Sequence, residues 1–352
     1  MARTSEDRKR LNALLAVFEG HASMVIVLQD NPDPDALASA MALRTLANTR
    51  SVACSIAYSG TIGRAENRAL VRYTRLNLRP LDELNLERYD LIAMVDTQPG
   101  QANNSLPEGV FPQIVIDHHP RTPESAQAAF ADIRSNVGAT STILVEYLQA
   151  AEIQPEPPLA TALLYGIRSD TQDFQRQGTQ ADIDAYAVLF PLANKRMLGG
   201  IQRGQAPPEY FQTLSAALLR ARRCGRSIFC PLGTLDNPDM VAEVADLLLR
   251  HENADWSLCW AVFGRQILLS VRTLSNDPPA VAVAQAVVAQ IGSGGGHAHM
   301  AGGQIPLTTG RPAELRRLDG HIRRAFLAAT GQQSHSCRRL ASPPRSAGGS
   351  RR

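Results

Sequence analysis

Acidic and histidine residues stand at the ends of several apolar segments in the first half of the chain. Seven such residues follow an apolar run directly or within a short loop: Asp33, Asp35, Asp96, Asp117, His118, His119 and Asp170. Charged groups at the edge of a buried sheet are costly unless they are paired or bind a cation. Several segments that end in this way therefore predict a cation site built from oxygen and imidazole ligands.

The kind and number of these ligands favour two metal ions. Carboxylate and imidazole donors without thiolates suit Mn²⁺, Mg²⁺ or Fe²⁺. Asp33 and Asp35 are two residues apart, so in an extended loop they could reach different ions, and Asp96 could bridge the two. Two cations about 3.5–4 Å apart activate water and clamp the oxygens of a phosphoryl displacement. The pattern therefore predicts a dinuclear hydrolytic site.

The segments around these residues alternate between strand and helix patterns. Short apolar runs predict strands at 24–28, 51–58, 91–95 and 114–116, and helical spacing predicts helices at 36–47, 66–76, 138–150, 159–168 and 181–192. Such alternation predicts an α/β fold, with a parallel sheet covered by helices on both faces. Ligands of such sheets bind beyond the carboxyl ends of the strands.

The pattern changes in the second half of the chain, which predicts a smaller α+β domain. Residues 208–223 read as a helix and 281–291 as another, and strands are expected at 227–232, 256–263 and 267–272. We expect five parts: an N-terminal helix or extension (1–19), the parallel-sheet domain (20–198), a linker helix (199–224), the α+β domain (225–330) and a disordered basic tail (331–352).

Composition limits the class of protein. Hydrophobic residues make up 44% of the 352 residues, and the net charge is only +3, too small to imply nucleic-acid binding. Of the 36 basic residues only Lys9 and Lys195 are lysines, so 36 − 2 = 34 are arginines. Because the arginines are spread along the chain, we interpret them as a codon bias rather than as an RNA-binding signal.

Location and redox state follow from the same composition. Residues 1–10 are charged and do not resemble a secretory signal, and no run approaches the about 18 apolar residues of a membrane span. The five cysteines lack CxxC spacing, so we expect neither a disulfide framework nor a zinc site: Cys54, Cys224, Cys230, Cys259 and Cys337. A reducing cytoplasm is the expected location.

Four motifs resemble those of the DHH phosphoesterases in order and spacing: 31–39 (NPDPDALAS), 95–97 (VDT), 117–120 (DHHP) and 166–171 (GIRSDT). The second half resembles the DHHA1 domain through 270–273 (SVRT) and 294–303 (GGGHAHMAGG). The resemblance covers about residues 20–310. It is nearest to the NrnA-like branch (nanoRNase and pAp phosphatase), whose members cleave very short oligonucleotides and 3′-phosphoadenosine 5′-phosphate.

The resemblance implies a role for each motif residue. Asp33 would hold the first metal, Asp35 the second, and Asp96 would bridge, while His118 and Asp170 would complete the second metal. His119 would contact the scissile phosphate or protonate the leaving oxygen, and Asp117 would orient its neighbours. In the DHHA1 domain the residues implied to bind substrate phosphate are Arg272, Gly294, Gly295, Gly296 and His297.

One position departs from the family pattern. Motif I usually begins with a histidine four residues before its first aspartate, and Gln29 occupies that position here. An amide oxygen is a weaker donor to Mn²⁺ than imidazole is. The first metal is therefore expected to be loosely held, of another kind, or absent.

The resemblance implies a metal-dependent phosphoesterase that hydrolyses short oligonucleotides, linear dinucleotides or pAp with water activated by two divalent ions, Mn²⁺ first. One alternative is an exopolyphosphatase or pyrophosphatase-like hydrolase, and another is a non-catalytic nucleotide sensor, which only Gln29 supports. Aromatic residues make up 5% and are not clustered, so a groove for long nucleic acid is not expected. No membrane partner is expected either, and a homodimer is left open.

Overall fold

The computed structural model describes residues 5–101, 103–175, 178–275, 277–296 and 298–341. The chain divides into two compact units, Met1–Gln205 and Ala206–Arg352. The structure does not have the single linker helix expected at 199–224, a segment whose residues are all described. Three elements cover this segment, one before the division and two after it. They are α7 (Lys195–Gln202) in the first unit, and α8 (Pro208–Arg220) and β7 (Arg222–Cys224) in the second.

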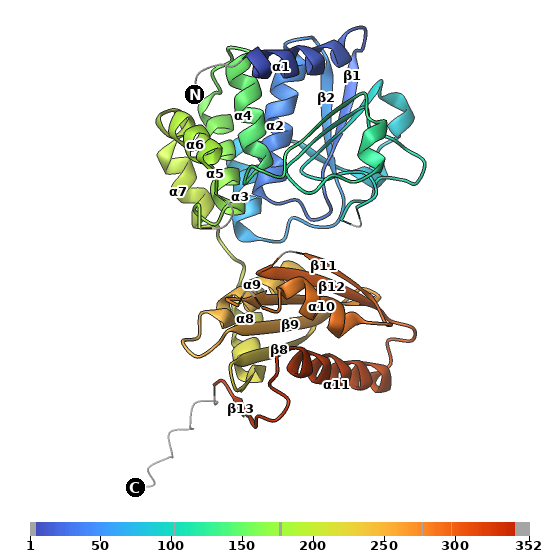
Figure 1. Cartoon of the computed structure of the whole chain (residues 1–352), viewed down its shortest axis with the longest axis vertical. Coiled ribbons are helices and arrows are strands. Elements are labelled where there is room, and N and C mark those ends of the chain that lie inside the picture. The colour runs from blue at the N-terminus through green and yellow to red at the C-terminus, as the bar shows by residue number, and fades with distance from the viewer. Residues whose placement is uncertain (1–4, 102, 176–177, 276, 297, 342–352) are drawn as a thin grey trace. The chain divides into compact units, whose positions relative to one another are not determined.

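The first unit is built on a six-stranded parallel sheet, which confirms the expected α/β architecture (Figure 1). Its strands are β1 (Ser23–Val27), β2 (Ala53–Tyr58), β3 (Leu78–Pro80), β4 (Leu91–Val95), β5 (Ile114–Asp117) and β6 (Phe130–Ile133). The strand order is β3-β2-β1-β4-β5-β6, and every neighbouring pair is parallel. This order reverses between β1 and β4, which is where sheets of this kind bind ligands.

The α-helices and the 3-10 helices cover different faces of this sheet. Besides α7, the helices are α1 (Ser5–Phe18), α2 (Pro34–Asn48), α3 (Ala65–Thr74), α4 (Thr140–Ala150), α5 (Pro157–Asp170) and α6 (Gln180–Leu192). Met24 and Ile26 of β1 belong to one buried cluster with residues of all these helices. Val25 and Val27 point the other way and pack with the 3-10 helices η1 (Leu81–Glu83) and η2 (Leu86–Arg88). The expected parallel sheet with both faces covered is therefore confirmed, and in the described residues 3-10 helices and loops, rather than α-helices, cover this second face.

The second unit is a seven-stranded mixed sheet with helices, in agreement with the expected α+β domain. Besides β7, its strands are β8 (Ser227–Thr234), β9 (Trp256–Phe263), β10 (Gln266–Thr273), β11 (Ser293–Gly296), β12 (Met300–Pro306) and β13 (Cys337–Arg339). Besides α8, its helices are α9 (Asp239–Leu249), α10 (Ala280–Val288) and α11 (Pro312–Ala329). Alternate residues of β9 join two separate cores, one with α10 and α11 and the other with α8 and α9. Within the described residues, no helix has the length and apolar character that a membrane span requires.

The C-terminal segment differs from the expected disordered tail. Strand β13 pairs with β7, and Cys337 forms a disulfide with Cys224, which corrects the expectation of no disulfide. The amide of Leu340 also donates to the carbonyl of Ala221 at 3.0 Å. The two cysteines are 113 residues apart, so no local spacing could predict their pairing. Residues 342–352 of the expected tail lie outside the described part of the chain.

Candidate metal centre

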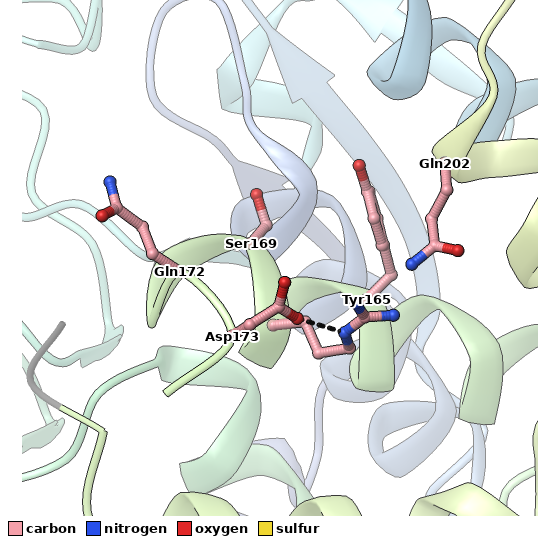
Figure 2. Close-up of a pocket in the computed structure, with 6 residues that line it drawn as sticks. Tyr165, Ser169, Gln172, Asp173 and Gln202 are labelled. Carbon is pink, nitrogen blue, oxygen red and sulfur yellow. Dashed lines mark hydrogen bonds and ion pairs between the residues drawn. The ribbon is translucent and has the colours of Figure 1, made fainter. Parts of the chain in front are cut away.

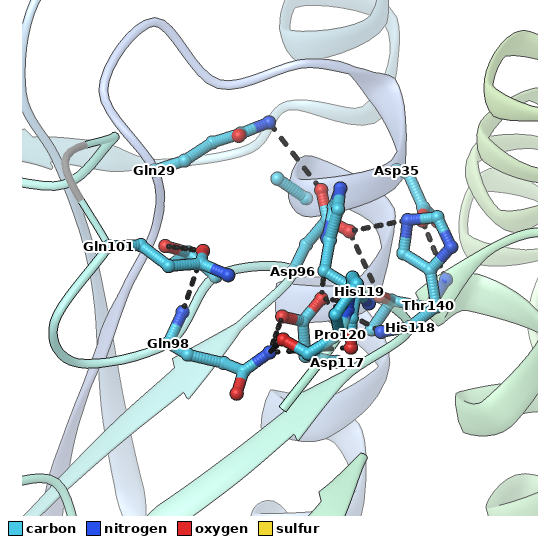
Figure 3. A network of polar contacts seen from close by, with 12 residues as sticks. Gln29, Asp35, Asp96, Gln98, Gln101, Asp117, His118, His119, Pro120 and Thr140 are labelled. Carbon is cyan, nitrogen blue, oxygen red and sulfur yellow. Dashed lines mark hydrogen bonds and ion pairs between the residues drawn. The ribbon is translucent and has the colours of Figure 1, made fainter. Parts of the chain in front are cut away.

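The residues expected to bind metal gather around the carboxyl ends of β1, β4 and β5 (Figure 3). Side chains of Asp96, Asp117, His118 and His119 offer ligand atoms that all lie within 4.8 Å of one another. A second group with the same property joins Asp35, His118 and Asp170. The sheet and the C-terminal end of α5 thus bring together residues that are up to 135 positions apart, from Asp35 to Asp170.

Helix α2 positions the two aspartates of the first motif. Asp33 is its N-cap: the backbone is extended there, and Oδ1 accepts a 3.0 Å hydrogen bond from the amide of Ala36. Pro34 starts the helix, where a residue without an N–H costs nothing. Asp35 follows in the first turn and is fully buried. The cap therefore serves local structure and also fixes where both carboxylates lie.

The buried carboxylate of Asp35 is held by the N-terminus of α4. Its Oδ2 accepts from the amide of Thr140 at 2.7 Å, and its Oδ1 accepts from the amide of Ser141 at 2.8 Å. Free amides and the positive end of the helix dipole favour an anion at this place. Gly166 of α5 permits the close approach of these groups, because a Cβ there would lie 2.7 Å from Ser141 Oγ and 3.1 Å from Asp35 Cα.

Asp96 is the central carboxylate, directly after β4, and its φ of 60° is in the left-handed region. Oδ1 accepts a 2.9 Å hydrogen bond from the hydroxyl of Thr140. Oδ2 faces the amide nitrogen of Gln29 at 3.5 Å, while the Gln29 oxygen accepts from Asn103 at 3.2 Å. Gln29 therefore lies beside the cluster with its amide nitrogen toward Asp96 (Figure 3), so this arrangement does not present its oxygen as a ligand.

His118 approaches two carboxylates through one ring nitrogen. Its Nε2 lies 3.2 Å from Oδ2 of Asp170 and 3.6 Å from Oδ1 of Asp96. In spite of these short distances the alignment is not that of a hydrogen bond, so among the described residues this buried nitrogen has no hydrogen-bond partner. A buried nitrogen surrounded by carboxylates and left without a hydrogen bond fits a metal ligand.

The carboxylate of Asp117 contacts both histidines and holds them in position. Its Oδ1 accepts from the amides of His118 and His119, at 2.8 and 3.2 Å, and lies 2.9 Å from His119 Nδ1. Its Oδ2 accepts from the side-chain amide of Gln98 at 2.7 Å. Gln98 is itself fully buried, and its oxygen accepts from Thr122 and Ser125. These contacts fix the positions of both histidines, and the role of Asp117 in the site stays a prediction.

Sequence analysis missed two residues of this network, Thr140 and Gln98. Gln98 comes two residues after Asp96, and Thr140 opens a helix after a glycine and an alanine. Both are fully buried polar side chains. A polar residue at the start of a helix is an available signal for Thr140, but its carboxylate partners are distant in sequence.

Burial and mutual repulsion act on the carboxylates of the cluster. Burial raises the pKa of Asp96 well above its usual value, and the charges of Asp35 and Asp33 raise it further. Burial also raises the pKa of Asp35. A divalent cation among these groups would offset both the burial and the repulsion, so the donor set fits Mn²⁺, Mg²⁺ or Fe²⁺.

The two neighbouring histidines are affected in opposite directions. Burial and the nearby charge of His119 lower the pKa of His118 to about 4, which keeps its ring neutral and suited to metal binding. Burial alone would lower the pKa of His119, but the hydrogen bond and charge of Asp117 outweigh it, so that pKa is raised. Asp117 therefore favours the protonated form of His119.

A polar pocket adjoins the end of α5 that carries Asp170 (Figure 2). It has a volume of about 310 Å³ and is lined by Tyr165, Arg168, Ser169, Gln172, Asp173 and Gln202. Asp173 accepts from Nε of Arg168 at 2.5 Å. The backbone of Gln172, Asp173 and Phe174 is left-handed at three successive positions, with φ of 49°, 54° and 67°. Such a run of non-glycine residues is strained, and strain of this kind concentrates at functional sites.

The residues expected to bind phosphate belong to the second unit, and none of them is part of the two ligand groups. Arg272 on β10 is buried; its guanidinium pairs with Asp246 and donates to Ser270 Oγ at 2.6 Å. Gly294, Gly295 and Gly296 form the edge strand β11, paired with β12. His297 lies outside the described residues. Substrate binding by these residues stays a prediction.

Comparison with known proteins agrees with this architecture. The pattern of the DHH family, N-terminal domain, matches residues 23–167, and that of the DHHA1 domain matches 228–324. The uncharacterised protein MJ1633 of Methanocaldococcus jannaschii is 35% identical over 291 residues, which are 82% of this chain. The chain spans only 59% of the length of that relative.

Two solved structures share the fold at low sequence identity. One is an exopolyphosphatase-related protein from Bacteroides fragilis, with a TM-score of 0.70 and 13% identity over 92% of this chain and 98% of that one. The other is RecJ from Thermus thermophilus in complex with Mn²⁺, with a TM-score of 0.52 and 14% identity over 93% of this chain and 55% of that one. The two matched domain patterns show that this chain belongs to the DHH family and consists of its N-terminal domain followed by a DHHA1 domain.

Proposed function

We propose that this protein is a metal-dependent phosphoesterase that hydrolyses short oligonucleotides or nucleotides. The observation that carries the proposal is the cluster of buried carboxylates around the hydrogen-bond-free nitrogen of His118. Burying several carboxylates close together without a cation costs free energy. It stands at the sheet edge where α/β proteins bind ligands.

Five residues would hold the metal in this proposal: Asp33, Asp35, Asp96, His118 and Asp170. Divalent cations bound by such ligands supply activated water and neutralise phosphoryl oxygens. Asp33 belongs to neither compact ligand group, but it is the N-cap of α2, two residues before Asp35. The resemblance to DHH phosphoesterases favours Mn²⁺, and RecJ of similar fold was solved with that ion.

In this proposal His119 acts as the general acid, which protonates the leaving oxygen. Its Nδ1 lies 2.9 Å from Oδ1 of Asp117, which fixes the orientation of the ring. Asp117 also favours the protonated ring. A protonated imidazole held in one orientation would protonate the leaving oxygen as the phosphoester bond breaks.

The pocket beside Asp170 supports a nucleotide as substrate. Its lining offers hydroxyl, amide and carboxylate groups, and the charge of Arg168 is already matched by Asp173. Such a lining suits the sugar hydroxyls and base edges of a nucleoside better than a chain of bare phosphates. Arg272, His297 and the glycines of β11 would bind phosphate in the second unit.

Inorganic polyphosphate is the second candidate substrate. The fold shared with the exopolyphosphatase-related protein of Bacteroides fragilis favours it. Polyphosphate would require the metal cluster and basic groups but no pocket for a nucleoside.

Turnover of linear dinucleotides, pAp and polyphosphate with Mn²⁺ would test the proposal. We expect release from the nucleotide substrates, loss of activity with chelator and loss of activity in Asp96→Ala. Asp184→Asn on α6, at a half-buried position, is the matched control and should retain activity. Release from polyphosphate alone would favour the second candidate, and no turnover with nucleotide binding retained would contradict an enzymatic function.

A further inference from the structure

Helix α11 presents four exposed arginines around a single glycine. Arg316, Arg317, Arg323 and Arg324 are exposed, whereas Leu318, Ile322 and Phe326 are buried in the core of the second unit. Relative to Gly320, the arginines occupy the positions four and three residues before it and three and four residues after it. Positions at these spacings are the surface neighbours of a helical residue. The four guanidinium groups therefore surround the glycine on one face of α11, and we call these five residues the arginine cradle.

The acidic residues of α11 do not neutralise the arginine cradle. Glu314 accepts from the amides of Thr308, Thr309 and Gly310, at 2.9, 2.8 and 2.8 Å. Asp319 accepts from the indole N–H of Trp260 at 3.1 Å. Among the residues that the structure describes, no ion pair joins any of the four arginines to a carboxylate. The face thus keeps an excess of positive charge.

Gly320 has no structural explanation in the helix itself. Glycine within a helix costs about 1 kcal/mol relative to alanine. Its φ is not in the left-handed region, and a Cβ there would meet only the guanidinium of Arg324, at 3.2 Å from Nη1. Neither packing nor backbone geometry therefore demands glycine. Its effect is to let the guanidinium of Arg324 lie close to the helix at the centre of the arginine cradle.

The geometry suits a chain of phosphates. Guanidinium groups bind phosphate oxygens through paired N–H donors. The outer two arginines, Arg316 and Arg324, are eight residues apart, which corresponds to about 12 Å along a helix. Four guanidinium groups over that length exceed what one phosphate requires. The exposed face has no large apolar residue to enter a lipid surface, since those of α11 are turned into the core.

We propose that the arginine cradle binds the phosphodiester backbone of a single-stranded nucleic acid. This surface is separate from the metal centre, which is built only from residues of the first unit. The proposal departs from the expectation that long nucleic acid is not a partner. That expectation rested on the few, unclustered aromatic residues. The arginines were separately interpreted as spread along the chain, whereas helix α11 gathers four of them on one face.

Binding of a fluorescein-labelled single-stranded RNA of about 20 nucleotides, followed by anisotropy in chelator, would test the proposal. Chelator prevents cleavage, so the result does not depend on the proposed enzymatic function. In the full chain we expect the substitutions R316Q, R317Q, R323Q and R324Q together to weaken binding at least about tenfold. They should also reduce the slope of log K against log salt concentration by up to about three, since each phosphate contact contributes roughly 0.7 to that slope.

A matched control removes the same charge elsewhere in the second unit. Arg250, Arg265, Arg338 and Arg339 are exposed and lie outside α11, so their joint replacement by glutamine should leave binding and its salt dependence unchanged. Neither fourfold variant should change turnover of a dinucleotide. Equal losses in the two variants would overturn the proposal, as would unchanged RNA binding in the α11 variant.

Gly320→Ala tests the cradle rather than the charge. The added methyl group should weaken RNA binding while thermal stability holds or rises, because alanine is the better helix former. Binding equal to that of the unchanged chain would overturn the role of Gly320. Flotation with vesicles containing phosphatidylglycerol is the competing arm: cradle-dependent binding to vesicles but not to RNA would overturn nucleic acid as the partner.

Discussion

The hydroxyl of Thr140 donates a 2.9 Å hydrogen bond to Oδ1 of Asp96. The backbone amide of the same residue donates to Asp35, so one threonine fixes two carboxylates from different elements. We expect Thr140→Val to keep the packing and the amide contact but to release Asp96. Loss of such a supporting contact typically lowers metal affinity by about 10–100-fold.

Titration of activity against Mn²⁺ concentration would measure this effect. Thr140→Ser keeps the hydroxyl and is the matched control, which should retain the metal dependence of the unchanged chain. An unchanged metal requirement in Thr140→Val would show that Asp96 does not need this contact.

Gly166→Ala should destabilise the first unit. The new Cβ would lie 2.7 Å from Ser141 Oγ and 3.1 Å from Asp35 Cα, so α5 would have to move away from α2 and α4. Overpacking of this kind costs about 1–3 kcal/mol in the free energy of unfolding. Gly199→Ala on α7 is the control, because a Cβ there meets nothing within 4 Å. Urea denaturation should show a loss for the first variant and no loss for the second.

A half-buried ion pair at the end of β6, between Asp132 and Arg134, should make stability depend on acid pH. Arg134 donates from Nε to Asp132 Oδ1 at 2.9 Å, and Tyr147 donates to Asp132 Oδ2 at 2.6 Å. Burial alone would raise the pKa of Asp132, but these hydrogen bonds and the Arg134 charge outweigh it, so that pKa lies below its usual 3.8. The ionised form is therefore stabilised by folding at neutral pH, and this contribution is lost as pH falls below 3.8 through the folded pKa.

Asp132→Asn should cost about 1.5–3 kcal/mol at neutral pH, because Arg134 loses one of its two carboxylate partners and keeps only Glu146. The difference from the unchanged chain should shrink as pH falls below 3.8. Denaturation at a series of pH values measures both effects, with the exposed Asp82→Asn as the control. A difference that is constant across this range would contradict the assigned ionisation.

Removal of the disulfide should destabilise the second unit. A bond that closes a loop of this length contributes about 2–4 kcal/mol in many proteins. Cys337→Ser should therefore lower the melting temperature, and reductant should lower that of the unchanged chain but not that of the variant. Cys54→Ser, which removes a free cysteine of the first unit, should keep the response to reductant.

The parallel sheet could be predicted because its strands are continuous apolar runs. Burial on both faces requires such runs, as in residues 91–95, all of which are buried. Strands β11 and β13 could not be predicted in this way, since their sequences SGGG and CRR lack apolar alternation. Their pairing depends on neighbours that are distant in the chain.

The acids of the candidate site were predictable from their position after strands. Their supporting partners were not, because a polar residue acquires that role only through tertiary contact. Thr140 is 44 residues from Asp96, and Gln98 is 19 residues from Asp117. The contact between Gln29 and Asn103 is likewise a product of folding, at a separation of 74 residues.

Strand β13 also affects the tendency of the protein to self-associate. Unpaired strand edges are templates on which another chain can add a strand, and aggregation begins from them. At this border of the second sheet the outermost strand is only three residues long, and two of them are the exposed arginines Arg338 and Arg339. Without it, the N–H and C=O groups of β7 on that side would face solvent. A chain shortened before Cys337 should therefore be prone to self-association even where its metal centre is intact.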